Sequence, residues 1–337
     1  MLRILHGTTI DFIRLWKITT AVTLLFIIPG IIWLAASPFK YSIEFTGGTL
    51  MQVAFARKPD AADLRAVLDR NGVRGAELQT FGSDTEYVIR AQNRESVALQ
   101  QRGAASVAAL ISSALKSRYG AAGYKVGRTE AVGPKVGQEL RQKALYAILA
   151  SFLITLIYLA WRFEWRFGVA AIAATAHDIL ATLAFIKYTN LEISLIVVGA
   201  VLTMIGYSLN DTIIIFDRVR ENIRRKRKES LYDTLNRSVN ETLPRSILTH
   251  ATALATLLAL TILGGEVIRP FAVVMLFGVF TGTFSSIYVA APVLLWIETR
   301  WPRRVGDESG AGARTAPGRE PDRASRPPRQ TQPAPTR

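Results

Sequence analysis

The sequence predicts an α-helical membrane protein of six transmembrane helices, with one extracytoplasmic α+β domain between the first and second helices. Three observations predict this fold class. Half of the 337 residues are hydrophobic, and they gather in six runs near the ~20 residues that cross a bilayer as a helix. A long segment without membrane character separates the first two runs. Separately from the fold class, the absence of cysteine excludes disulfide and thiolate chemistry.

The first run, from Ile18 to Ala36, follows Arg14 and Lys17. It is longer than the core of a signal peptide, so we expect a retained helix rather than a cleaved signal. Pro29 is expected to kink this helix and Pro292 the sixth. The other helices are expected at residues 144–161, 167–186, 195–216, 245–263 and 271–297, with Pro244 as a first-turn residue if the fifth extends back to it.

The basic residues orient the bundle. The formal net charge is +15, and the densest basic stretches are 218–228 and the tail after Arg300, which both flank apolar runs. The positive-inside rule therefore predicts that both termini are cytoplasmic. Charge in these places anchors the helices to the membrane and requires no nucleic-acid partner. We expect a cytoplasmic N-terminus and first helix at 1–38, the remaining bundle at 139–304, and a disordered basic tail at 305–337.

Residues 39–138 have the pattern of a small soluble domain. A strand is expected at 49–55, because apolar and polar residues alternate there. Two more are expected at 76–81 and 86–91, on either side of the turn signal Gly82-Ser-Asp84, and a last one at 125–132. Helices are expected from Pro59-Asp60 to about Asn71 and over 97–119. The resulting order, βαββαβ, is the ferredoxin-like plan. Some RNA-binding domains share it, but the strands lack the aromatic residues that stack bases.

An acid, Asp211, lies inside the fourth apolar run. A carboxylate at membrane depth costs about 2.5–3.5 kcal/mol and by default indicates a cation- or proton-binding site. Tyr207 and Ser208 lie three or four residues before it and could hold the carboxyl or relay a proton, with Asn210 beside it. The alternatives are a packing hydrogen bond or a helix that ends at Asn210. The apolar residues 213–216 that follow argue against an early end.

Two further groups of polar residues lie in the membrane. The end of the fourth helix and the start of the fifth share a depth, so Arg245 is a candidate partner for Asp211, and its withdrawal would let the acid take up a proton. The alternative is an arginine that reaches the lipid phosphates. His250 could extend this relay or be a buried structural histidine. His177 and Asp178, near the centre of the third helix, form a secondary candidate site.

Small residues recur at helical spacing in two runs. Gly199, Thr203, Gly206 and Asn210 share one face of the fourth helix. Gly278, Gly282, Ser286 and Ala290, each four residues apart, form a similar ridge on the sixth. Such faces allow helices to approach closely, within the chain or against a partner. No HExxH, GxSxG or P-loop motif is present. An intramembrane protease built on Ser208 and His250 would lack any known nucleophile motif, so we expect no catalytic residue, no metal site and no enzyme activity.

Three motifs carry a resemblance to a known family: Ile43-Glu-Phe-Thr-Gly-Gly48, Val132-Gly-Pro-Lys-Val-Gly137 and Ser208-Leu-Asn-Asp through Arg-Glu-Asn222. With them the chain resembles the SecF-like branch of the SecD/SecF family, which is related to the proton-driven RND exporters. The resemblance covers nearly everything before the tail. Glu44 replaces the usual aspartate of the first motif, and the extended tail is atypical.

The resemblance implies a multi-pass subunit of the bacterial inner (cytoplasmic) membrane that works with a SecD-like subunit. Such subunits assist translocation of an unfolded preprotein through SecYEG after the SecA-driven step. They use the proton-motive force, with protons as the coupling ion and no other cofactor. By motif position, Asp211 and Arg245 match the acid and the arginine associated with proton conduction in the family.

Two other functions remain open at this point. A half-exporter of RND type would carry lipids or small molecules, but such exporters usually have a second large soluble loop. The segments 187–194 and 264–270 are too short for one. A non-conducting scaffold for SecD would use the ionisable residues only for packing. Replacement of Asp211 by asparagine distinguishes the scaffold from the proton-driven subunit.

Overall fold

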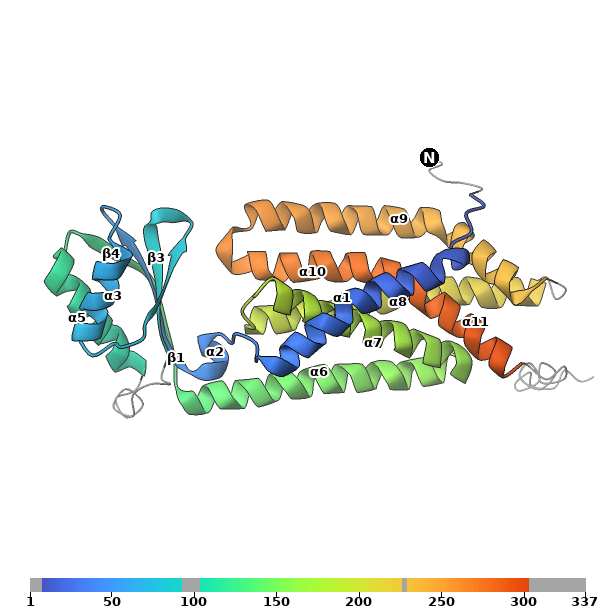
Figure 1. Cartoon of the computed structure of the whole chain (residues 1–337), viewed down its shortest axis with the longest axis horizontal. Coiled ribbons are helices and arrows are strands. Elements are labelled where there is room, and N and C mark those ends of the chain that lie inside the picture. Colours follow the sequence, from blue (N-terminus) through green and yellow to red (C-terminus); the bar gives the residue numbers. More distant parts are fainter. Residues whose placement is uncertain (1–7, 93–103, 226–228, 303–337) are drawn as a thin grey trace, which may run out of the picture.

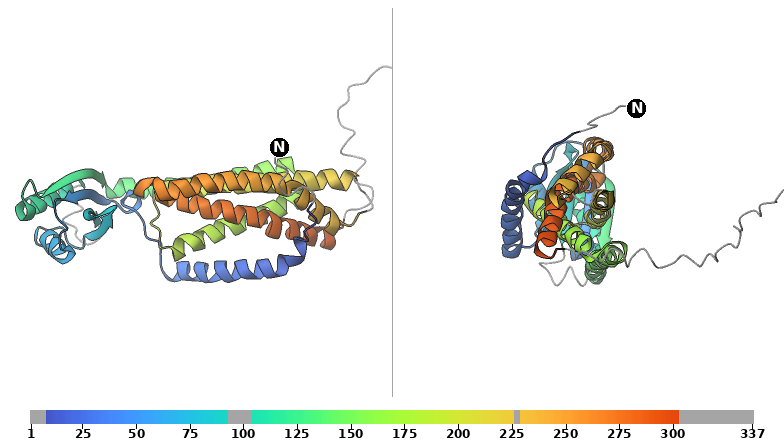
Figure 2. Two further views of the ribbon diagram at one scale, coloured as in Figure 1. Left: turned by 90° about the horizontal axis from the view of Figure 1, so that it is seen from above. Right: turned by 90° about the vertical axis from the view of Figure 1, so that its right-hand side faces the viewer.

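The computed structural model describes residues 8–92, 104–225 and 229–302. The molecule is elongated, with a small sheet domain beyond one end of a long helical bundle (Figures 1 and 2). The tail expected at 305–337 lies outside the described residues, as do 97–103 of the second expected domain helix.

Within the described residues, six helical segments are long and apolar enough to cross a membrane. They confirm the predicted fold class. Their helices are α1 (Trp16–Ala36, after the short 3-10 turn η1 at Ile13–Leu15), α6 (Pro134–Arg162), α7 (Trp165–Tyr188), α8 (Leu195–Arg225), α9 (Leu231–Leu263), and a sixth segment of α10 (Gly265–Ser285), the π-helical turn η2 (Ser286–Ala290) and α11 (Ala291–Arg300).

Several helices run well past the expected apolar runs. The helix α6 begins ten residues before Ala144, α8 continues nine residues beyond Phe216, and α9 begins at Leu231. Hydropathy marks the part of a helix that can lie in lipid, whereas polar turns can extend the same helix into water. Pro244 consequently lies inside α9 and not in its first turn. In the sixth segment the regular helix is interrupted at η2, just before Pro292.

Burial divides the helices into two sets. Between 50% and 56% of the apolar windows of α7, α8 and the sixth segment are buried, against 6 to 17% for α1, α6 and α9. The end-on view in Figure 2 shows the helices gathered into one bundle, with α1 on its outside. The fourth helix is therefore central, and the residues on its inner face are shielded from lipid.

The soluble domain has the predicted βαββαβ order. Its strands are β1 (Gly48–Phe55), β2 (Glu77–Phe81), β3 (Ser83–Gln92) and β4 (Tyr124–Val132), and its helices are α3 (Ala61–Arg70) and α5 (Ala104–Tyr119). The sheet is antiparallel with the order β2-β3-β1-β4. Apolar side chains of β1 and β3 pack on both helices, which lie on the sheet face away from the bundle (Figure 1). Asp60 caps α3 by accepting the Ala62 N–H.

Candidate functional site

Asp211 lies buried at a meeting point of three helical elements, with 3% of its surface exposed. Ser246 of α9 donates to its Oδ1 at 2.6 Å, and Ser286, the first residue of η2, donates to its Oδ2 at 2.9 Å. Both carboxylate oxygens thus have a hydroxyl donor. The donors are supplied by helices far apart in sequence, so the site exists only in the folded bundle.

Arg245 does not reach this carboxyl. Its side chain lies exposed on the surface of α9, because Ser246 faces α8 and consecutive helical residues point about 100° apart. Among the described residues, Asp211 forms no ion pair with a basic side chain. The expected contact between Asp211 and Arg245 is therefore absent from this chain on its own, and the carboxyl is held by neutral groups.

A second carboxyl, Asp178 of α7, is fully buried in the same bundle. Its Oδ2 accepts from Ser285 at 2.7 Å and from Ser208, and its Oδ1 lies 3.0 Å from Nδ1 of His177. Ser208 is a sequence candidate to hold Asp211 or to pass a proton. It faces α7 and α10 instead: the three steps from Ser208 to Asp211 turn the helix by about 300°, so the two side chains point about 60° apart.

The two carboxyls occupy adjoining sites. Ser285 and Ser286 are consecutive residues, and each donates to a different one of them. Counting residues from the centre of each apolar run does not reveal this proximity, because it ignores how the helices tilt and pack. The π-helical turn begins at Ser286, and such turns are frequent at functional sites.

The remaining predicted site residues near Asp211 are Tyr207, His250 and Asn210. Tyr207 is partly buried and its ring meets that of His250 edge-on, with 5.6 Å between the ring centroids. Within the described residues, the Tyr207 hydroxyl and Nδ1 of His250 are buried without a hydrogen-bond partner. Asn210 is exposed on the outer face of α8 and does not share the site.

The predicted glycine faces have different surroundings. A Cβ at Gly278 would collide with Met204, and one at Gly282 would lie 2.8 Å from Cβ of Ser208, so this ridge packs α10 against α8. At Gly199 and Gly206 a Cβ would meet no atom of this chain within 4 Å. Gly278 and Gly282 therefore let α10 pack directly on α8 beside Ser208, whereas Gly199 and Gly206 lie on an open surface.

Charged residues fix the far end of α8, away from the sheet domain. Asp217 accepts two hydrogen bonds from Arg162, at 3.0 and 2.8 Å, which ties α8 to α6. Arg218 and Asn222 both donate to Oε2 of Glu241 on α9, at 2.6 and 2.7 Å. These contacts at the polar end of the third motif hold α8 against α6 and α9, and they lie apart from the carboxyl sites.

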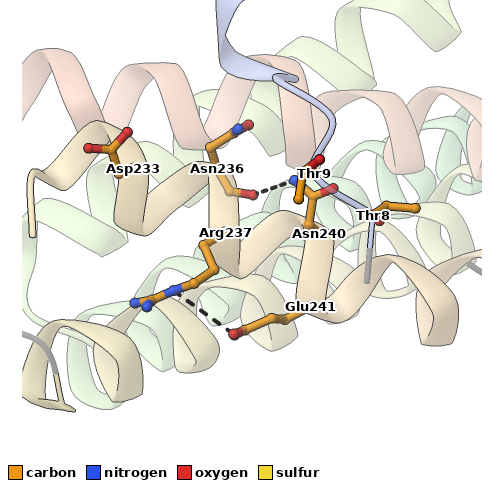
Figure 3. A pocket seen from close by; sticks show the side chains of 7 residues that line it. All are labelled: Thr8, Thr9, Asp233, Asn236, Arg237, Asn240 and Glu241. Carbon is orange, nitrogen blue, oxygen red and sulfur yellow. Dashed lines mark hydrogen bonds and ion pairs between the residues drawn. The ribbon is translucent and has the colours of Figure 1, made fainter. Parts of the chain in front are cut away.

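A polar pocket lies at the same end, between the N-terminal segment and α9. Figure 3 shows its lining: Thr8, Thr9, Asp233, Asn236, Arg237, Asn240 and Glu241. Asn240 and Asn236 hold the segment by accepting the backbone N–H of Ile10 at 3.0 Å and of Phe12 at 2.9 Å. None of the predicted site residues lines this pocket, so it does not mark the candidate site.

Sequence reasoning did not identify the serines that donate to the carboxyls, although it placed Ser286 in the small-residue ridge of the sixth run. Ser246, Ser285 and Ser286 have no charge, and serine is common at helix contacts inside membranes. The available signal was the adjacent pair Ser285-Ser286 within an apolar run that already carried a small-residue ridge. Its partners could be identified only once α7, α8 and α10 were placed together.

Two protein families match the chain. The family described as protein export membrane protein SecD/SecF, C-terminal, matches residues 112–300. The SecD/SecF GG motif matches residues 32–58, which include Glu44, Gly47 and Gly48. The first match covers more than half of the chain and contains all the carboxyl and serine residues described above.

Curated relatives match along nearly their whole length. The protein translocase subunit SecF of Gemmatimonas aurantiaca is 56% identical over 90% of this chain and 91% of the relative. The corresponding subunit of Rickettsia felis is 37% identical over 86% of this chain and 92% of the relative.

A solved structure has the same architecture. The crystal structure of SecDF from Thermus thermophilus, described as a translocon-associated membrane protein, superposes with a TM-score of 0.74 at 33% identity. The match covers 87% of this chain but spans only 39% of that longer chain.

Proposed function

Because the chain belongs to the SecD/SecF family as a SecF subunit, we propose that its bundle passes protons inward and couples their energy to Sec-dependent protein translocation. The subunit is a multi-pass membrane protein of a translocase and not an enzyme. The proton route, the residues along it and the partners beyond SecD make up the proposal.

The buried carboxyl of Asp211, held by neutral hydroxyls, is the observation that carries the proposal. An ionised carboxylate at membrane depth is costly unless a cation compensates it. Ser246 and Ser286 give it hydrogen bonds but no positive charge. Such a group is stabilised either by a proton or by a positive charge that is brought close to it, and the change between these two states is the step that a proton-driven subunit requires.

The counter-charge is expected beside the open face of α8. Thr203, Gly206 and Asn210 are exposed there, and Arg245 is exposed on α9. The SecDF structure contains a chain more than twice as long as this one, so a SecD subunit is the natural occupant of this face. We propose that SecD packs on it and brings Arg245 into the proton path.

Asp178 gives the path a second carboxyl. It lies beside Ser285, whose neighbour Ser286 contacts Asp211, and it has His177 at 3.0 Å as a basic neighbour. A proton released by one carboxyl could be taken up by the other after small rotations of these hydroxyls. Tyr207 and His250, with their unpartnered buried atoms, extend the polar lining on the α9 side.

The energy available is sufficient to shift helices. One charge that crosses the membrane yields about 2.3 kcal/mol per 100 mV, and a few kcal/mol determine which of two conformations is populated. In the proposed cycle the soluble domain acts on an unfolded preprotein that leaves SecYEG after SecA has pushed it. Both termini then lie in the cytoplasm, and lipid surrounds α1, α6 and α9.

Asp211→Asn tests the proposal. The variant keeps a side chain that accepts from the serines but cannot change charge. Co-expressed with SecD in cells depleted of the native subunits, it should lose the stimulation of preprotein translocation by the proton-motive force. Asp211→Glu, which keeps a carboxyl, serves as the matched control and should retain part of that stimulation.

Unchanged stimulation in Asp211→Asn at normal protein levels would mean that the subunit is a scaffold for SecD. Equal loss in Asp211→Asn and Asp211→Glu, with reduced protein level in both, would assign the carboxyl to folding. The same assay on Asp178→Asn tests the second carboxyl, and full activity there would limit the path to Asp211.

A further inference from the structure

The glycine motif after α1 lies at a junction between the soluble domain and the helix that carries Asp211. Its first four residues form the short helix α2 (Ile43–Thr46). Ile43 and Phe45 are buried, with 2% and 6% of their surfaces exposed. The segment therefore packs like a core element, although it connects a membrane helix to the first strand of the sheet.

On one side the motif packs against the start of α6. Gly47 has a φ of +72°, and a Cβ there would lie 2.8 Å from Cα of Pro134. A Cβ on Gly137 would in turn lie 2.9 Å from the backbone nitrogen of Gly47. The backbones of the first two motifs are thus in direct contact, and only glycine permits this approach. Strand β4 ends at Val132, so this contact also anchors the sheet.

On the other side Glu44 adds a second capping acceptor to α8, beside Ser194, whose hydroxyl accepts the Val197 N–H at 3.3 Å. The backbone N–H of Leu195, the first residue of α8, donates to Oε2 of Glu44 at 2.6 Å, and Ser42 Oγ lies 3.2 Å from the same oxygen. The first N–H groups of a helix have no partner within the helix, and its N-terminus attracts negative charge. Glu44 satisfies both requirements from a different part of the chain.

The short loop before α8 is held on both of its sides. Ile193 pairs by its backbone with the linker after α1, donating to Lys40 O at 2.8 Å and accepting from Ser42 N at 2.9 Å. From the sheet, Arg90 of β3 forms a 2.6 Å ion pair with Glu192. Burial raises the pKa of Glu192 above its usual value, and Arg90 acts in the opposite direction. The loop thus joins the soluble domain to α8.

The helix α8 is continuous from this cap to the carboxyl. Sixteen residues separate Leu195 from Asp211, about 24 Å at 1.5 Å per residue, and no break lies between them. An axial shift or rotation of α8 at Asp211 therefore also moves its first turn. That turn contacts Glu44, and the loop before it is paired through Ile193 with the linker after α1.

We propose that Glu44 is a positioning residue that transmits movement of α8 to the soluble domain. It holds the first turn of α8 against the glycine motif, and the motif holds the base of the sheet through Gly47 and Gly137. This inference rests on the proposed function, since it assumes that Asp211 moves α8. Glu44 takes no part in proton transfer itself.

The test separates transmission from proton movement. Glu44→Ala removes the acceptor of the Leu195 N–H but leaves Ser194, whose hydroxyl accepts the Val197 N–H at 3.3 Å. Glu44→Asp keeps an acid. Each full chain, co-expressed with SecD, is assayed for three quantities: amide hydrogen exchange in the first turn of α8, proton uptake by vesicles, and translocation driven by the proton-motive force.

Glu44→Ala should speed exchange at the Leu195 N–H by about fivefold, the factor that corresponds to one lost capping hydrogen bond of about 1 kcal/mol. It should reduce translocation several-fold while Asp211-dependent proton uptake remains. Glu44→Asp should restore both exchange and translocation. Unchanged translocation in Glu44→Ala overturns the proposal, and so does an equal loss of proton uptake and translocation.

A charge reversal keeps the test valid if Glu44→Ala fails to accumulate. Arg90→Glu should weaken translocation by repelling Glu192, and the double variant Arg90→Glu with Glu192→Arg should recover it. No effect of Arg90→Glu, or no recovery in the double variant, counts against the proposal that this loop transmits movement from α8 to the soluble domain.

If Asp211→Asn keeps translocation driven by the proton-motive force, the proposed function fails. If Asp211→Asn loses this translocation while Glu44→Ala keeps it, only the proposed transmission through Glu44 fails.

Discussion

The two faces of α8 carry similar residues in opposite surroundings. On the inner face, glycines of α10 approach Met204 and Ser208 so closely that no side chain fits between the helices. On the outer face, Gly199 and Gly206 have no neighbour within 4 Å of a Cβ position. Spacing alone marks both as helix-packing faces. The comparison shows that one is filled by this chain and the other is available to a partner.

Polar groups on the two faces differ in the same way. Asp178 and Asp211 on the inner side each accept hydroxyl hydrogen bonds from two serines. On the outer side Asn210 of α8 and Arg245 of the neighbouring α9 are exposed. Lipid satisfies polar groups poorly, so a polar partner in the membrane would stabilise this side of the bundle.

The largest expected effect is on the inner face. Gly282→Leu would force α10 away from Ser208, and overpacking of a tight contact costs about 1–3 kcal/mol or more. The separation would also break the serine contacts to both carboxyls. We expect a strongly lowered midpoint of thermal unfolding in detergent and little folded protein. A midpoint within error of the wild type would show that the close contact is not needed.

Sequence reasoning succeeded where the signal is local. Alternating residues predicted the strand at 49–55, a turn signal predicted the strands at 76–81 and 86–91, and an acid among apolar residues singled out Asp211. Each of these patterns is visible within a few positions. The polar ends of α8 and α9 were missed, since hydropathy reports immersion in lipid and not helicity. The donors of Asp211 were missed because Ser246 and Ser286 are 40 residues apart, and only tertiary packing brings them together.

An intermediate effect is expected from Ser286→Ala. The variant removes one donor to Asp211 without steric conflict, and a hydrogen bond to a charged or polarised acceptor contributes about 1.5–3 kcal/mol. Ser285→Ala is the matched variant, since it removes the neighbouring donor to Asp178 instead. Thermal unfolding of both should fall moderately, by less than in Gly282→Leu. If only Ser285→Ala were destabilised, the Ser286 contact would carry no weight in the fold.

The smallest effect on the chain itself, and the sharpest test of the two faces, is expected from Gly206→Leu. The added side chain enters open space, and leucine favours a helix over glycine by roughly 0.5–1 kcal/mol, so the unfolding midpoint of the isolated chain should not fall. Co-purification with SecD should nevertheless be lost, because the bulky residue blocks the approach of a second helix. Val22→Leu on α1, an exposed position away from this face, should leave co-purification intact.

Retained pairing in Gly206→Leu would place SecD elsewhere and leave the exposed Arg245 without its proposed partner. A destabilised Gly206→Leu chain would mean that the outer face of α8 is already packed in the isolated subunit.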